Sequence, residues 1–141
     1  EVFTLVGRQT AEVKMQGAAS GAFNLPEHNA VLLFVTLNKS EKDFSPSTQY
    51  NDYLINDEYF HWQSKNTDSH YNSGGRKYIE QPKTGIKIIL FVREEKKDGF
   101  GNTSPFHCFG LVDYVSSHDD FPMNVKWKLQ KPAMAQYLKA I

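Results

Sequence analysis

The 141 residues are enough for one domain, and their content of 40% hydrophobic and 23% charged residues is that of a globular protein, which excludes a disordered chain. Sixteen basic residues balance sixteen acidic ones, so the bulk charge does not indicate a polyanion binder, and a nucleic-acid role would depend on local groups of lysines. The single cysteine excludes an internal disulfide and favours a reducing, cytoplasmic location, while no apolar run approaches the ~20 residues that cross a membrane.

The N-terminal third contains one clear strand. Residues 9–15 fit either a short helix or a strand, and residues 17–21 are small enough for a loop. Residues 30–37 are almost continuously apolar, which predicts a central strand buried on both faces. A polar loop follows over residues 38–47, and residues 50–55 fit either a helical turn or an extended connector.

The middle of the chain is also rich in predicted strands. Residues 58–63 alternate as a strand and lead into a long loop over residues 66–75. Residues 76–81 are expected to be a strand and residues 82–85 a turn. Residues 86–93 form the strongest strand signal in the sequence.

The C-terminal third continues the pattern. A charged hairpin loop over residues 94–104 precedes a strand over residues 106–116, in which Gly110 is expected to form a bulge that curves the sheet. Residues 119–122 are a predicted turn. Residues 125–129 then alternate with their apolar side chains inward and their lysines outward.

Residues 133–141 are expected to form a short terminal helix. The regular spacing of short strands predicts one mainly β domain over residues 1–141, an open pseudobarrel of about six to eight strands. Because the sequence begins at Glu1 without an initiating Met, we expect a fragment of a longer protein.

The residues offer little for catalysis, so we expect a non-enzymatic domain without a cofactor or metal. The five histidines have no partners at zinc-site spacing. His107 and Cys108 are neighbours on a predicted strand, so they should face opposite sides and could not share a proton. His118 with Asp119 and Asp120 could hold a cation, but a solvated turn is the favoured interpretation.

A binding surface is better supported. Cationic, amide and aromatic side chains of the kinds that contact phosphates and base edges lie in predicted loops and at strand ends. For each lysine alone a solvated surface charge is the simpler explanation, and Trp62 and Trp127 are expected to pack in the core. The candidate DNA-binding residues are Lys39, Lys42, Gln49, Tyr50, Asn51, Gln63, Lys65, Asn66, Arg76, Lys77 and Arg93.

Several segments, taken in order and spacing, resemble the domain of unknown function at the C-terminus of bacterial helicases that also carry a phospholipase-D-like nuclease. The resemblance spans roughly residues 30–130. Its segments are FVTLNK (34–39), YND (50–52), FHWQSK (60–65), LFVRE (90–94), FG (109–110), YV (114–115), PM (122–123) and VKWKL (125–129).

The resemblance implies a target-reading module of restriction or defence proteins, whose helicase or nuclease lies elsewhere in the chain or the complex. The fold also looks like the pseudobarrel DNA-binding domains of plant transcription factors and certain restriction enzymes, in which two loops grip the major groove of double-stranded DNA. Residues 38–51 would be one of these loops, or arms, and residues 63–67 would be the other. The second arm adds Ser64 to the candidate DNA-binding residues. Phe60 and Trp62 would anchor the second arm in the core.

The expected function is therefore sequence-specific or modified-base-specific recognition of duplex DNA. The alternative is a protein-interaction module that docks a helicase or nuclease subunit onto a partner through exposed aromatic residues such as Tyr50, Tyr53 and Tyr59.

Overall fold

The protein was analysed as a computed structural model, which describes residues 12–13, 21–38, 51–95, 97 and 100–138. The strands are β1 (Glu12–Val13), β2 (Gly21–Leu25), β3 (Ala30–Asn38), β4 (Tyr53–Leu54), β5 (Tyr59–Gln63), β6 (Lys87–Glu95), β7 (Phe106–His118) and β8 (Asn124–Leu129). The helices are the 3-10 turn η2 (Pro26–His28) and the α-helices α1 (Ser73–Ile79), α2 (Gln81–Thr84) and α3 (Ala135–Leu138).

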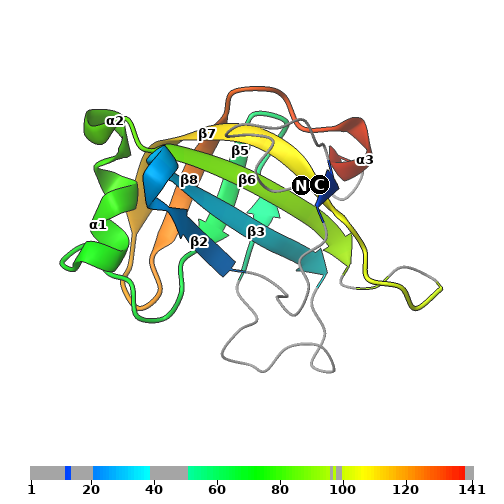
Figure 1. Ribbon diagram of the computed structural model, residues 1–141, viewed down its shortest axis with the longest axis horizontal. Helices are drawn as coiled ribbons and strands as arrows, with labels where there is room; N and C mark the ends of the chain where they lie inside the picture. The colour runs from blue at the N-terminus through cyan, green and yellow to red at the C-terminus, as the bar shows by residue number, and fades with distance from the viewer. Residues whose placement is uncertain (1–11, 14–20, 39–50, 96, 98–99, 139–141) are drawn as a thin grey trace.

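The strands form one mixed sheet that curls without closing. Its order is β2-β3-β6-β7-β8-β5-β4, with β1 paired to β7, and only β3 and β6 run parallel among the described strands. Figure 1 shows α1 and α2 at one end of the curled sheet and α3 near the other. The prediction of a mainly β, open pseudobarrel is confirmed.

The two parallel strands, β3 and β6, lie inside the sheet between β2 and β7, and both of their faces are apolar. Val31 and Leu33 of β3 belong to the larger hydrophobic cluster, inside the curl, whereas Leu32 and Phe34 belong to a second cluster. All four side chains are at most 2% exposed. The prediction of a central strand buried on both faces is confirmed.

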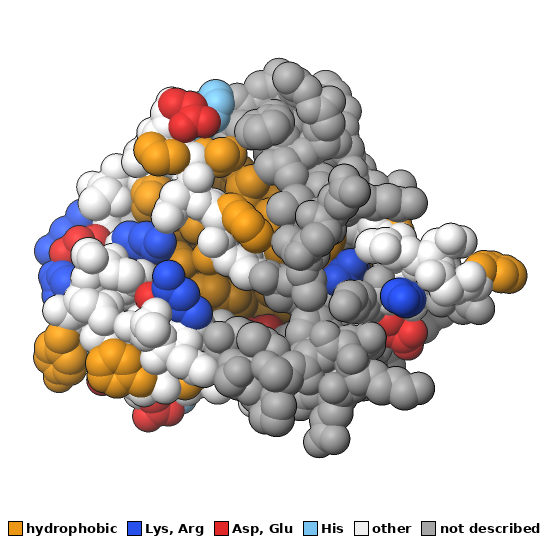
Figure 2. Space-filling view, turned by 60° about the horizontal axis from the view of Figure 1, so that its bottom comes forward, with side chains coloured by type: hydrophobic (Ala, Val, Ile, Leu, Met, Phe, Trp, Pro, Cys, Tyr) orange, Lys and Arg blue, Asp and Glu red, His pale blue; other side chains and the backbone are white. Residues whose placement is uncertain are grey.

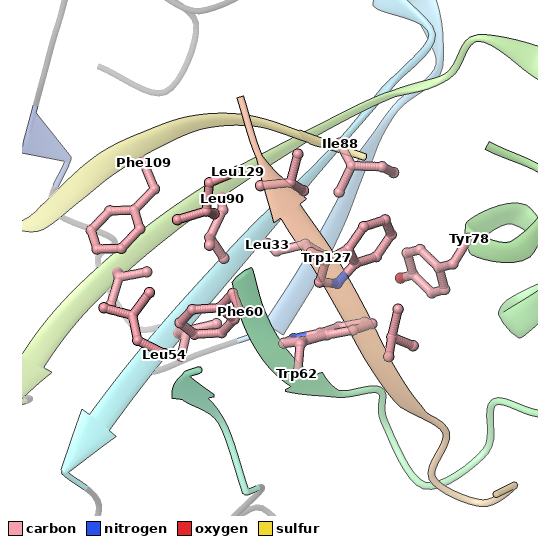
Figure 3. Close-up of a cluster of buried hydrophobic side chains, with 14 of the residues drawn as sticks. Leu33, Leu54, Phe60, Trp62, Tyr78, Ile88, Leu90, Phe109, Trp127 and Leu129 are labelled. Atoms are coloured by element: carbon pink, nitrogen blue, oxygen red, sulfur yellow. The ribbon is translucent and has the colours of Figure 1, made fainter. Parts of the chain in front are cut away.

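The second half of the barrel buries alternate residues of β5 and β8. Phe60 is fully buried and Trp62 is 5% exposed, and both face the interior that Trp127 of β8 also fills (Figure 3). The rings of Trp62 and Trp127 lie 6.2 Å apart between centroids. The expected anchoring role of Phe60 and Trp62 is confirmed, as is the inward-facing pattern of residues 125–129.

The long strand β7 bends at an irregularity. Leu90 pairs with Gly110 but the next residue, Phe91, pairs with Cys108, so Phe109 is an extra residue on β7. Gly110 has a φ of 85°, which an L side chain rarely adopts. The predicted bulge is confirmed, and it increases the local twist that curls the sheet.

The predicted strand over residues 76–81 is wrong, because these residues belong to α1 and α2. Asn72 caps α1 by accepting a hydrogen bond from the N–H of Gly75 at 3.1 Å. Tyr78 then enters the core at 1% exposure. The expected turn at residues 82–85 is likewise α2, which ends at Gly85 with a φ of 71°.

The described residues of the two ambiguous segments, 9–15 and 50–55, include one short strand each. Glu12–Val13 pairs with β7, and Tyr53–Leu54 pairs with β5. The terminal helix is confirmed as α3, whose Tyr137 packs edge-on against Phe109 with ring centroids 4.9 Å apart. None of the helices in the described part of the chain is long and apolar enough to cross a membrane.

Candidate functional site

The first predicted arm is described only at its two ends. Asn38 closes β3 and Asn51 precedes β4. Lys39, Lys42, Gln49 and Tyr50, four of the candidate DNA-binding residues, lie outside the described residues.

Gln63, at the start of the second predicted arm, is a cross-link between strand ends. Its Oε1 accepts the backbone N–H of Asn51 at 2.6 Å, and its Nε2 donates to Oδ1 of Asn124 at 3.0 Å. Its own backbone N–H donates to Oδ1 of Asp52 at 2.8 Å. Both ends of the amide are therefore occupied within the protein, which suits Gln63 to positioning the loops around it.

Ser64 is fully buried, so it leaves the set of candidate contact residues. Its Oγ accepts the backbone N–H of Met123 at 3.0 Å and donates to the carbonyl of Lys65 at 3.1 Å. This bonding holds the loop after β5 against the turn before β8. Lys65 and Asn66 follow directly and are both exposed, as expected for residues of the second predicted arm.

Lys65 and Lys77 both act electrostatically on the buried carboxylate of Asp68. Burial raises the pKa of Asp68 above its usual 3.8, and the charges of Lys65 and Lys77 offset part of that rise. Burial also lowers the pKa of Lys77, opposed by Asp68, and its Nζ donates to Oδ1 of Asn24 at 3.1 Å. Lys77 therefore links α1 to β2 and also interacts with the loop after β5 through Asp68.

Arg76 lies on the exposed side of α1, but its charge is shared with an acid. Its Nη2 lies 2.7 Å from Oε2 of Glu80 one turn later. Figure 2 shows the same mixture on a larger scale, with acidic side chains among the Lys and Arg side chains at the left of the described surface. Arg76 is thus a weaker candidate for a phosphate contact than an unpaired surface cation.

Arg93 is a structural residue, since its side chain is only 2% exposed. Its Nε donates to Oγ1 of Thr36 at 2.9 Å and its Nη1 donates to the carbonyl of Ser104 at 3.2 Å. The guanidinium carbon lies 4.2 Å from the ring centroid of Phe106. An arginine at the end of a strand was expected to reach DNA, but here the guanidinium fastens the β3–β6 pair to the start of β7.

A cavity of about 340 Å³ lies beside Arg93. Lys97 and Arg93 line it together with Glu94 and Glu95, so its charges balance. His107 contributes an imidazole whose Nδ1 is 2.7 Å from the Tyr137 hydroxyl. The cavity therefore shows no preference for an anion.

A group of residues that sequence reasoning did not assemble lies on the outer face of β5 and β8. Tyr59 pairs with Lys128 and His61 pairs with Lys126 across the two strands. The Nζ atoms of Lys126 and Lys128 lie 4.7 and 5.0 Å from the Tyr59 ring centroid. Glu58 lies 3.5 Å from Lys128 and neutralises part of its charge.

The edge strand β4 extends this surface. Tyr53 stacks on His61 with ring centroids 4.6 Å apart and an interplanar angle of 17°, and 44% of Tyr53 remains exposed. The His61 ring is fixed by its Nδ1, 2.8 Å from the carbonyl of Asn51. We call this surface the lysine–aromatic face; it consists of Tyr53, Tyr59, His61, Lys126 and Lys128.

The sequence contained part of the signal for this face. Alternation placed Lys126 and Lys128 outward, and the same reasoning applied to residues 58–63 turns Tyr59 and His61 outward. Alternation predicts which face a residue is on, but it does not predict the register between β5 and β8 that places these residues opposite one another.

The sequence was also compared with known proteins. A search of curated proteins finds no match. The family described as "Domain of unknown function (DUF3427)" matches residues 1–140, nearly the whole sequence, and the chain belongs to this family.

Proposed function

We propose that the chain is a module that recognises double-stranded DNA by sequence or by a modified base and that carries out no chemistry on the DNA itself. It would serve a helicase or nuclease of restriction or defence type, in the same chain or in a complex, in the cytoplasm. The observation that carries this proposal is the lysine–aromatic face, where two ammonium groups lie over an outward tyrosine ring.

The chemistry of this face suits a nucleic acid. Ammonium groups bind backbone phosphates and release the counterions that surround DNA, which supplies most of the affinity. The exposed ring of Tyr53 and the amphipathic Tyr59 offer contact to the sugars and phosphates of a duplex. Because Glu58 shares the charge of Lys128, we expect modest affinity and a contribution from further cations.

Among the described residues of the predicted arms, Asn51, Lys65, Asn66 and Thr67 are exposed, and Lys65 and Asn66 are the candidate contacts on the second arm. Both follow Ser64, which fastens their loop to the turn before β8. A short loop held at its base loses little conformational entropy when it binds, so these two side chains are suited to contacts that depend on geometry.

The proposal is tested by the salt dependence of duplex binding, followed by fluorescence anisotropy from about 50 to about 200 mM salt. Two phosphate contacts contribute a slope of about 1.8 in log Kobs against log salt, at ~0.9 each. A protein with Lys126→Gln and Lys128→Gln should therefore bind more weakly and with a slope shallower by about that amount.

The matched control is a protein with Lys83→Gln and Lys87→Gln. Both of these lysines are exposed, on α2 and at the start of β6, and their loss removes the same net charge. Equal effects of the two double substitutions would mean that bulk charge, and not the lysine–aromatic face, attracts DNA.

The second candidate function is protein docking, favoured by a different pair of side chains. Tyr71 is 86% exposed and Phe121 is 60% exposed, on two loops that the hydrogen bond from Phe121 N–H to the Asp68 carbonyl holds together at 3.0 Å. Aromatic rings of this kind are common at the centres of protein interfaces. The test is a protein with both Tyr71→Ser and Phe121→Ser. If it no longer associates with a helicase or nuclease subunit, and if neither it nor the wild type binds DNA, protein docking becomes the preferred function.

A further inference from the structure

Three side chains near the turn between β7 and β8 form a continuous hydrogen-bonded relay. Nδ1 of His70 lies 2.8 Å from Oδ1 of Asp120, and Nε2 of the same ring lies 2.7 Å from Oγ of Ser117. His70 lies in the loop after β5, whereas Ser117 is the last residue but one of β7 and Asp120 lies in the turn that follows. A serine, an imidazole and a carboxylate thus meet from two segments almost fifty residues apart in the chain.

The contacts define the direction of each proton. The backbone N–H of His70 also donates to Oδ1 of Asp120, at 2.7 Å, and these bonds hold the pKa of Asp120 below its usual 3.8. The carboxylate is therefore the acceptor and Nδ1–H the donor, which leaves Nε2 of the neutral ring to accept the hydroxyl proton of Ser117. The Tyr114 hydroxyl, 2.7 Å from Oγ, then donates to that oxygen.

The relay is accessible to solvent. The side chains of His70 and Asp120 are 27% and 29% exposed, and Ser117 is partly exposed. A register shift between Tyr114 and Ser116 interrupts the β7–β8 pairing beside it. Bulges of this kind often re-aim side chains next to functional sites. Figure 1 shows the loop after β5 beside the β7–β8 turn, below α1.

Tyr71 and Phe121 are next to His70 and Asp120 in the chain, and both are largely exposed. The two loops that carry His70 and Asp120 therefore present aromatic surface to solvent. A substrate with an aromatic or aliphatic group beside a carbonyl carbon would therefore be better accommodated than a small charged one.

We propose that Ser117 is a nucleophile activated by His70 and that it accepts the acyl group of carboxylic esters with apolar substituents. The Ser117 hydroxyl transfers its proton to Nε2 of His70 while Oγ bonds to the carbonyl carbon. The C–O bond to the alcohol breaks, and the protonated His70 returns the proton to the leaving oxygen. Water then attacks the acyl-serine with His70 as base, releasing the acid and restoring Ser117. Asp120 acts as a positioning residue.

The proposal is independent of DNA binding and is tested on the whole chain with two probes, an alkyl fluorophosphonate and p-nitrophenyl acetate. Mass spectrometry should find one phosphonate per protein, on the peptide that contains Ser117. Nitrophenol release should show a first turnover that Ser117→Ala abolishes. His70→Gln, which cannot accept the proton, should slow labelling by about 100-fold or more.

The matched control is Ser116→Ala, an exposed serine one residue away that takes no part in the relay. It should be labelled at Ser117 like the wild type. Asp120→Asn should slow labelling, because Nδ1 of His70 loses the carboxylate that orients the ring, and Asp120→Glu should restore part of the rate. Circular dichroism separates loss of reactivity from loss of fold. A folded wild type without label, or equal labelling of the Ser117→Ala or His70→Gln protein, would overturn the proposal.

Discussion

The ring of Trp62 on β5 meets the ring of Tyr78 on α1 edge-on, with centroids 5.0 Å apart and planes 72° from parallel. Tyr78 in turn contacts Trp127 of β8 at 5.9 Å (Figure 3). This contact joins the strand that precedes the Lys65 loop to the helix that follows it. The aromatic core and the candidate binding surface are therefore two sides of the same strand.

Trp62→Ala should lower the free energy of unfolding by about 3–5 kcal/mol, because it removes a buried indole and leaves a cavity between Tyr78 and Trp127. Lys65→Ala, three residues along and exposed, should change it by no more than ~0.5 kcal/mol. Urea unfolding of the two variants measures both values. The opposite ranking would reverse the inward and outward assignment of residues 60–66.

Arg93→Ala should lower the free energy of unfolding by about 3 kcal/mol, since two hydrogen bonds to a charged group, at ~1.5 kcal/mol or more each, are lost from a buried site. The stacking on Phe106 is lost as well. At temperatures where the variant is folded, the salt slope of DNA binding should match that of the wild type. A stable variant with a shallower slope would return Arg93 to the binding surface.

Gly75→Ala should be far more destabilising than Gly85→Ala. A Cβ on Gly75 would meet the Ser69 carbonyl and Met123 Sδ, so the start of α1 would have to move, at about 3 kcal/mol or more. A Cβ on Gly85 meets nothing within 4 Å and carries only the strain of a φ of 71°, roughly 1 kcal/mol. Thermal unfolding compares the pair, and similar melting temperatures would contradict the close packing at Gly75.

Asp68 should make the protein less stable as the pH rises. Its folded pKa is raised above the unfolded 3.8, mainly by burial, so the folded state binds the proton more tightly. The protonated form is present in both states below pH 3.8, and the penalty grows as the pH rises through the folded pKa. Asp68→Asn should therefore stabilise the protein at neutral pH and lose that advantage in acid.

The measurement for Asp68→Asn is the urea midpoint as a function of pH. Asp57→Asn, at an exposed aspartate, is the control and should leave the midpoint unchanged across the range. An Asp68→Asn protein that is less stable at pH 7 than the wild type would mean that the carboxylate's attraction to Lys65 and Lys77 exceeds the effect of burial.

The strands were predictable because the order of apolar and polar residues along each strand reflects which of its faces are buried. Apolar runs predicted β3 and β6, buried on both faces, and alternation predicted β5 and β8. The helix α1 was not predictable in the same way. Gly74 and Gly75 in its first turn lack helix propensity, and they are there because Asp68, Ser69 and Met123 leave no room for a side chain.

The candidate site was predictable only in part. Outward lysines on β8 and an exposed Lys65 follow from alternation and loop composition, but the sequence does not say that Lys126 and Lys128 lie over Tyr59. That placement depends on strand register. Likewise the position of Arg93 near the end of a predicted strand suggests an exposed side chain. It is buried because Thr36 and Phe106, which are distant in the sequence, contact its guanidinium group in the fold.

The most direct test of DNA recognition is selection from a random pool of duplex DNA at low and moderate salt, with the bound fraction sequenced. DNA recognition by this chain predicts an enriched motif and recovery that falls as salt rises. It also predicts that the enrichment is lost in the protein with Lys126→Gln and Lys128→Gln. Recovery without a motif and without salt dependence would contradict the account and favour protein docking.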